Sequence, residues 1–228
     1  MRTLLAVIVL CHLSASAHAK EFGHYDISSV ISIDKSVPEK PTATVNISYF
    51  VQILNDLGSH AGNWPPPFDT VDDRHRAEHD VTVLSGLLDT VADNFHDESL
   101  LLRLALLHSV GHNLDIPGSG EKAVAVFDKV IELWPNDLQA NFRDGVFLAG
   151  TDKYRRNAIP LLEKAKALGV VDADYPLGLT YMSLGEKAKA VENLKSYTTR
   201  VATDENAART LDVVIHDKVE MKQLPAGP

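Results

Sequence analysis

The sequence is almost free of cysteine, because Cys11 is the only one among its 228 residues. It lies in a leader, residues 1–19, that we expect to be removed, so that the mature chain would contain no thiol. A chain without thiols has no disulfide bond, no thiolate ligand for zinc and no cysteine nucleophile. We therefore expect a protein that is stabilised by packing alone.

The leader has the parts of a signal peptide. Arg2 supplies the positive charge, Leu4–Leu10 is an unbroken apolar run, and Ala17-His18-Ala19 gives the small-x-small pattern that a signal peptidase reads. The run is far shorter than the roughly 20 residues of a membrane-spanning helix. That favours cleavage after Ala19, with a retained anchor as the alternative. Leu10 stands where a lipoprotein signal would carry Gly, Ala or Ser, which argues against lipidation. We expect a periplasmic or secreted protein.

Positive charge is scarce along the chain. Lysine and arginine number 22 against 31 aspartates and glutamates, which gives a formal net charge of -9, and there is no long basic run. Phosphate backbones and anionic membrane surfaces attract clustered cations. Nucleic acid and lipid surfaces are therefore poor partners for this protein.

The sequence also lacks the signatures of common catalytic sites. It contains no Gly-x-Ser-x-Gly elbow and no phosphate-binding glycine loop with its lysine. Its glycine-rich stretch, Pro117–Gly120, coincides with a predicted turn between helices. We expect no enzymatic activity and no cofactor. A catalytic site between the N-terminal extension and the helices that follow stays an alternative.

Residues 20–70 form this N-terminal extension, which is richer in proline than the rest. Apolar side chains recur at helical spacing between Val45 and Leu57 and predict one amphipathic helix. The apolar stretch Val30–Ile33 either forms a short strand or packs as an extended segment. Trp64–Phe68, with three prolines, is interpreted as a rigid corner whose two aromatic rings pack against the next helix. A polyproline recognition motif is the alternative.

Small residues recur at a fixed period within residues 71–224. Three glycines lie 34 and 33 residues apart, and three alanines lie 35 and 32 apart. Each glycine is followed three residues later by Leu or Tyr, and each alanine is followed four residues later by Phe or Leu. The two series are Gly111, Gly145 and Gly178, and Ala123, Ala158 and Ala190. Periods of this length are typical of helical repeat proteins.

With these residues the sequence resembles the tetratricopeptide repeat family, whose pattern is W-x2-L-G-x2-Y followed by A-x3-F. The third copy matches best, and the middle copy departs at Asp144, where the family has Leu. The resemblance implies an all-α, right-handed helical solenoid of about three helix pairs. Helices at 77–92 and 206–221 would cap it, because uncapped terminal repeats leave apolar surface in water. The N-terminal extension would precede the solenoid.

In this family the first helix of each pair lines a concave groove that holds partner peptides. Transferred to this sequence, the groove-facing side chains are His108, His112, Phe142, Val146, Tyr175, Leu179 and Met182. This set lacks the Lys, Arg and Asn with which some family members clamp a C-terminal carboxylate. An apolar and aromatic groove instead favours burial of hydrophobic side chains of a partner peptide or helix. Coverage of the groove by the extension is the open alternative.

Two histidine pairs are spaced four residues apart on predicted helices, His75 with His79 and His108 with His112. Each pair points to one side of its helix and has the spacing of two metal ligands. We predict no metal site, with metal or small-ligand binding by these pairs as the alternative. The expected function is a protein-interaction scaffold or adaptor of a bacterial cell envelope, because exported proteins of this repeat type are mainly bacterial.

Overall fold

The computed structural model describes residues 21–34, 36, 42–92 and 95–216. The predicted leader, residues 1–19, and residues 217–221 of the predicted last helix lie outside the described residues. The elements, in chain order, are η1 (Ile27–Val30), β1 (Ile31–Asp34), β2 (Thr42–Val45), α1 (Ile47–Ala61), α2 (Val71–Asp89), α3 (Glu98–Asn113), α4 (Ser119–Leu133), α5 (Leu138–Gly150), α6 (Arg155–Ala167), η3 (Val171–Ala173), α7 (Asp174–Ser183), α8 (Lys187–Arg200) and α9 (Glu205–Ile215).

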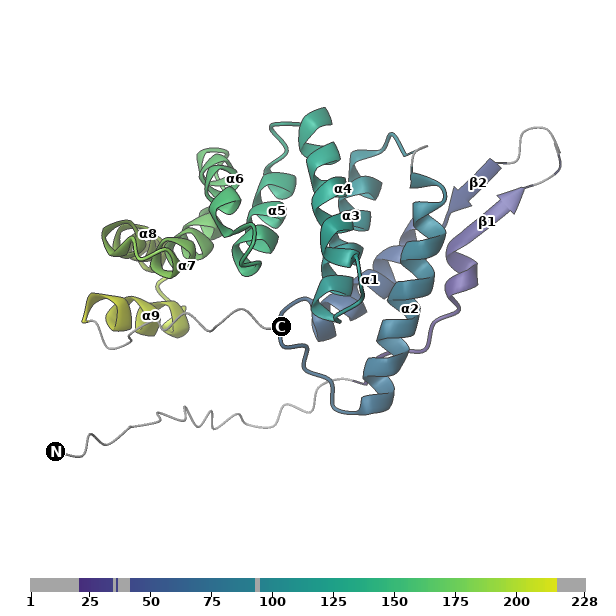
Figure 1. Cartoon of the computed structure of the whole chain (residues 1–228), viewed down its shortest axis with the longest axis horizontal. Helices are drawn as coiled ribbons and strands as arrows, with labels where there is room; N and C mark the ends of the chain where they lie inside the picture. The colour runs from purple at the N-terminus through teal and green to yellow at the C-terminus, as the bar shows by residue number, and fades with distance from the viewer. Residues whose placement is uncertain (1–20, 35, 37–41, 93–94, 217–228) are drawn as a thin grey trace.

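The helices α3 to α8 pack as pairs, α3 with α4, α5 with α6 and α7 with α8, and each pair contacts the next. Figure 1 shows these helices following one another in chain order, from the hairpin β1–β2 at one end to α9 at the other. Helix α2 packs on α3, and α9 packs on α8. The structure is an all-α solenoid preceded by a small hairpin, which confirms the fold predicted from the repeats.

Capping side chains fix where several helices begin. Asp97 accepts a hydrogen bond from the Leu100 amide at the start of α3, with an oxygen–nitrogen distance of 2.8 Å. Asp204 accepts one from Ala207 N at 2.9 Å at the start of α9. Each such bond satisfies a backbone N–H that has no partner inside its own helix. The two aspartates thus fix the first turns of α3 and α9.

The repeating glycines and alanines let paired helices approach closely. A Cβ added at Gly145 would lie 2.7 Å from Leu162 Cγ, and one added at Gly178 would lie 2.7 Å from Leu194 Cγ. Both leucines are fully buried, and so are Ala158 on α6 and Ala190 on α8. The repeat pattern is therefore a packing pattern, in which a small residue on one helix faces a large one on its partner.

A Gly178→Ala variant is expected to lower the free energy of unfolding by about 1–3 kcal/mol, because the new methyl group overpacks against the buried side chain of Leu194. Gly86, inside α2, has no heavy atom within 4 Å of an added Cβ. A Gly86→Ala variant is expected to raise the free energy of unfolding by about 0.5–1 kcal/mol, since alanine favours helix. Urea denaturation of both variants measures whether their free energies of unfolding change in opposite directions. A stabilising effect of Gly178→Ala as well as of Gly86→Ala would contradict the close packing of Gly178 against Leu194.

The N-terminal extension, which includes α1, shares a hydrophobic core with α2 and α3. Strands β1 and β2 pair antiparallel with Ile31 opposite Val45. Of the apolar stretch Val30–Ile33 that sequence left undecided, residues 31–33 are therefore strand, whereas Val30 ends η1. Phe22, Ile27 and Val30 are buried in the same cluster as side chains of α1, α2 and α3. The helix predicted within the extension is α1, which contacts α3. The extension is therefore packed onto the first part of the solenoid.

The proline-rich corner packs with only one of its two aromatic rings. The Phe68 ring stacks on His60, with ring centroids 5.5 Å apart. The Trp64 side chain is 71% exposed, so the expectation that this ring is also packed away is wrong. His60 lies in α1 rather than in the helix that follows the corner. Phe68 therefore fixes the corner against the helix that precedes it.

Buried apolar side chains form two clusters along the solenoid. The first is built from residues between Phe22 and Ala140, and the second from residues between Leu148 and Val214. Helix α5 contributes to both, since Ala140 belongs to the first and Leu148 to the second. The middle of α5, where Asp144 lies, is thus the place where the two cores meet.

Candidate functional site

The first helices of the three pairs lie next to one another, because α3 contacts α5 and α5 contacts α7. The repeat resemblance placed seven side chains on the side of these helices that faces a partner. The structure leaves six of them at least partly exposed, and we call these six the first-helix face: His112, Phe142, Val146, Tyr175, Leu179 and Met182. The seventh, His108, is buried.

His108 is 1% exposed, so its predicted place on the partner-facing surface is wrong. Its Nε2 lies 2.9 Å from Asp89 Oδ1 at the end of α2, and Lys122 Nζ lies 2.7 Å from Asp89 Oδ2. Burial lowers the pKa of His108, and the Asp89 carboxylate opposes that shift. His108 therefore joins α3 to α2, and through Asp89 to Lys122 of α4, instead of facing a partner.

His112 lies at the edge of the first-helix face. Its ring packs edge-on against Phe147 of α5, with centroids 5.4 Å apart and planes at 76°. The Phe147 ring in turn lies 6.2 Å from the ring of Phe127 on α4. Phe147 was missed by the sequence analysis, because the repeat phase pointed to Val146, its neighbour in the chain. These aromatic contacts connect the first pair of helices to the second.

The middle of the first-helix face is apolar. Val146 on α5 is 41% exposed, which is high for such a side chain. Phe142 on α5 and Met182 on α7 are partly buried and pack at the border of the second hydrophobic cluster. The two helices therefore each contribute an apolar side chain next to the same buried cluster.

Tyr175 lies at the C-terminal end of the face. Its ring centroid is 5.2 Å from that of Tyr197 on α8, and its hydroxyl lies 3.5 Å from Thr210 Oγ1 of α9. The capping helix α9 therefore borders the face on this side. Tyr175 offers a partly buried ring held in place by two neighbouring helices, which is the kind of rigid aromatic side chain that anchors interfaces.

Two buried carboxylates lie on the helices that form this face. Asp144 on α5 is 1% exposed, and its Oδ1 has no hydrogen-bond partner among the described residues. Burial, followed by the charge of Asp128, raises the pKa of Asp144 to about 7. Asp174 at the start of α7 is fully buried but lies against Lys166, Arg200 and Ser196. Of these two carboxylates, only that of Asp174 is paired with a cationic side chain among the described residues.

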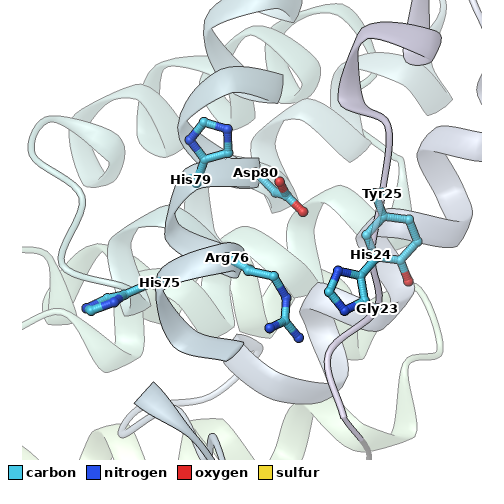
Figure 2. Close-up of a pocket in the computed structure, with 7 residues that line it drawn as sticks. All are labelled: Gly23, His24, Tyr25, His75, Arg76, His79 and Asp80. Carbon is cyan, nitrogen blue, oxygen red and sulfur yellow. The ribbon is translucent and has the colours of Figure 1, made fainter. Parts of the chain in front are cut away.

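A pocket of about 340 Å³ lies away from this face, between the N-terminal extension and α2. Figure 2 shows the side chains that line it: Gly23, His24, Tyr25, His75, Arg76, His79 and Asp80. His24 was missed by the sequence analysis, because it lies far from α2 in the chain and belongs to no helical pattern. The pocket is formed only when the extension packs against α2.

No further metal ligand stands beside the histidine pair on α2, His75 and His79, in the described part of the chain. Among the described residues, no group of three or more His, Cys, Asp or Glu side chains is arranged to hold a metal ion. In Figure 2 the His75 ring is directed away from the extension, whereas Arg76 and Asp80 are directed toward it. The pair His108 and His112 is separated by the burial of His108. The alternative of a metal site on these pairs therefore has no support from the geometry.

No helix in the described part of the chain has both the length and the apolar character needed to cross a membrane. The described part comprises residues 21–216 with their gaps, and it does not include the predicted leader, residues 1–19.

Comparison with known proteins relates the chain to others by fold alone. No protein-family model matches the sequence, and no curated protein matches it. A crystal structure of MamA aligns with 67% of this chain and 86% of its own, at 24% identity and a TM-score of 0.54. A structure of MamA residues 41 to the end from Desulfovibrio magneticus RS-1 aligns with 64% of this chain and 76% of its own, at 23% identity and a TM-score of 0.49. The first of these supports a tetratricopeptide-like fold.

Proposed function

We propose that the protein is a non-enzymatic scaffold or adaptor that binds a peptide or helix of a partner protein on the first-helix face. The observation that carries this proposal is the set of partly exposed apolar and aromatic side chains on the adjacent helices α3, α5 and α7. Side chains of this kind dominate the energetics of protein interfaces. A solenoid supports such a face because each repeat is held rigidly by its neighbours.

The chemistry of the face indicates what kind of segment it would bind. Apart from His112 its members are apolar or aromatic, and none is a lysine, an arginine or an asparagine. A carboxylate clamp is therefore not its mode of binding. An amphipathic helix or extended peptide that buries apolar side chains between α5 and α7 suits this surface best.

We place the protein in the bacterial cell envelope. This part of the proposal is supported by the signal-peptide features of residues 1–19 and by the tetratricopeptide-like fold. N-terminal sequencing of the protein from a cell-envelope fraction tests it. A mature chain that begins at Lys20 is expected, and an intact Met1 would contradict export by cleavage.

Loss of three apolar side chains from the face is expected to abolish partner binding. The partner is first captured by in-cell crosslinking and then purified, and its affinity is measured by calorimetry. We expect a variant with Phe142→Ala, Tyr175→Ala and Met182→Ala to bind at least about 100-fold more weakly than wild type, because aromatic anchors carry most of the binding energy.

A matched variant separates partner binding from general damage to the solenoid. Leu133→Ala, Ile159→Ala and Val191→Ala remove three apolar side chains from the second helices α4, α6 and α8 instead. Circular dichroism checks that both variants remain helical. The matched variant is expected to bind the partner as wild type does. Equal affinity of all three proteins would show that the first-helix face is not the binding surface.

A further inference from the structure

The pocket between the N-terminal extension and α2 contains one buried carboxylate without a partner. Asp80 is 7% exposed, and no residue in the described part of the chain donates a hydrogen bond to it or forms an ion pair with it. Tyr25 Oη and Gly23 N, which also line the pocket, both donate to Asp56 Oδ2 instead, at 2.7 and 2.9 Å. In Figure 2 the Asp80 carboxylate is directed toward the extension. Because a buried carboxylate without a donor is costly, this pocket is where a donor from outside the protein reaches it.

The cationic side chain nearest to the extension is already engaged. Arg76 contacts the Asp73 carboxylate, donates through Nη2 to Phe22 O at 2.9 Å, and lies 3.8 Å from Glu21 Oε1. The ring of His24 lies 3.7 Å from the same carboxylate oxygen of Glu21. Arg76 and His24 are therefore turned to these partners, and neither is a counterion in contact with Asp80.

The formal charge beside the pocket is negative when the histidines are neutral. The single positive charge of Arg76 is set against the three carboxylates of Glu21, Asp73 and Asp80. Burial raises the pKa of Asp80, and the opposing effects of the neighbouring cationic groups do not cancel that rise. A raised carboxyl pKa means that the negative charge is under-compensated in the folded protein. A ligand with a positive charge and N–H donors supplies what Asp80 lacks.

The pocket suits an organic ammonium group better than a metal ion. Among the described residues, no three His, Cys, Asp or Glu side chains are arranged to hold a metal ion. An ammonium group needs no such set of ligands, because its N–H groups donate directly to a single carboxylate. The volume of about 340 Å³ leaves room for a small organic body as well. The rings of Tyr25, His24 and His79 line this space and offer contacts to that body.

We propose that this pocket binds a small organic primary amine through its ammonium group. The ammonium group donates a charge-assisted hydrogen bond to the Asp80 carboxylate, and the aliphatic part of the ligand lies against the rings that line the pocket. The pocket exists only when the extension is packed on α2, so the bound amine also stabilises that packing. The site lies away from the first-helix face and does not depend on the function proposed for that face.

Calorimetric titration of the purified chain with n-butylamine at neutral pH tests the proposal. Saturable binding with a dissociation constant below about 10 mM is expected. n-Butanol has a similar length without the charge, and tetramethylammonium has the charge without an N–H donor. Each is expected to bind at least about 10-fold more weakly than n-butylamine. The absence of saturable n-butylamine binding would overturn the proposal, and so would equal affinity for tetramethylammonium.

Two aspartate variants locate the binding site. Asp80→Asn keeps the size of the side chain, removes its charge, and is expected to weaken n-butylamine binding by about 10- to 100-fold. Asp72→Asn removes the same charge from an exposed position of α2 outside the pocket, and it is expected to bind as wild type does. Equal affinity of Asp80→Asn and wild type would overturn the proposal.

Nuclear magnetic resonance of the side-chain carboxyl carbons in the wild-type protein gives the same answer without a substitution. Titration with n-butylamine is expected to shift the resonance of Asp80 and to leave that of Asp72 in place. This measurement decides the matter if Asp80→Asn does not fold. A titration that reaches saturation without moving the Asp80 resonance would overturn the proposal.

Discussion

At about pH 8, an Asp144→Asn variant is expected to have a free energy of unfolding roughly 2–4 kcal/mol higher than wild type. Asp144 is 1% exposed and its Oδ1 has no hydrogen-bond partner among the described residues. Burial and the nearby charge of Asp128 raise the pKa of Asp144 from 3.8 to about 7. Above pH 7 the folded protein therefore contains a buried, uncompensated negative charge, which asparagine removes without changing the size of the side chain.

The direction in which the free energy of unfolding changes with pH follows from the raised pKa of Asp144. Between pH 3.8 and about 7 the folded state binds a proton at Asp144 that the unfolded state has released. The stability that this proton contributes is fully present below pH 3.8 and is lost as the pH rises through 7. The stability difference between variant and wild type is thus expected to grow from about pH 4 to about pH 8 and then to stay constant.

Urea denaturation of both proteins across this pH range measures the difference. Asp128→Asn serves as the control, because Asp128 is exposed and contributes less to the shift than burial does. The control is expected to give a smaller gain with the same sign. A difference between Asp144→Asn and wild type that is equal at both ends of the pH range would contradict the assignment.

Simultaneous replacement of Lys166 and Arg200 by alanine is expected to lower the free energy of unfolding by about 3–5 kcal/mol. Asp174 is fully buried, Lys166 Nζ lies 2.6 Å from its Oδ1, and Arg200 contacts its Oδ2. The lysine contact is an ion pair without hydrogen-bond geometry. Without both cations, the hydroxyl of Ser196, at 2.7 Å, is the one side-chain partner of the Asp174 carboxylate among the described residues. A buried charge without a counterion is strongly destabilising.

A triple variant distinguishes this cause from lost packing. Adding Asp174→Asn to the double variant removes the uncompensated charge while keeping a group that accepts the hydrogen bond of Ser196. The triple variant is expected to recover most of the lost stability, measured by urea denaturation at neutral pH. If the third substitution restores nothing, the loss comes from the side-chain stems of Lys166 and Arg200, and the electrostatic explanation is wrong.

The repeat fold was predictable from sequence because its determinants are local and periodic. Gly145 and Gly178 recur in phase with Ala158 and Ala190, and the structure shows that all four stand where helices of one pair touch. Such a pattern is visible without knowing how one pair is placed against the next. The same holds for the caps at Asp97 and Asp204, whose hydrogen bonds span three residues.

The candidate sites were only partly predictable, because they depend on contacts between distant segments. Helical spacing alone put His108 beside His112, but the Asp89 carboxylate that holds His108 inside belongs to a different helix. The proline run alone could not show that Trp64 is exposed and that Phe68 is partly buried, since the ring that stacks on Phe68 comes from α1. For the same reason no local pattern brings His24 to the pocket on α2.

The central claim, that the first-helix face binds a partner, is tested most directly by a photo-crosslinker placed at single positions. Val146 on α5 is 41% exposed and lies on the face, whereas Leu133 at the end of α4 is 52% exposed and lies on a second helix. We expect that a probe at Val146 captures one partner protein in cells and that a probe at Leu133 does not. Capture of the same protein from Leu133 but not from Val146 would contradict it.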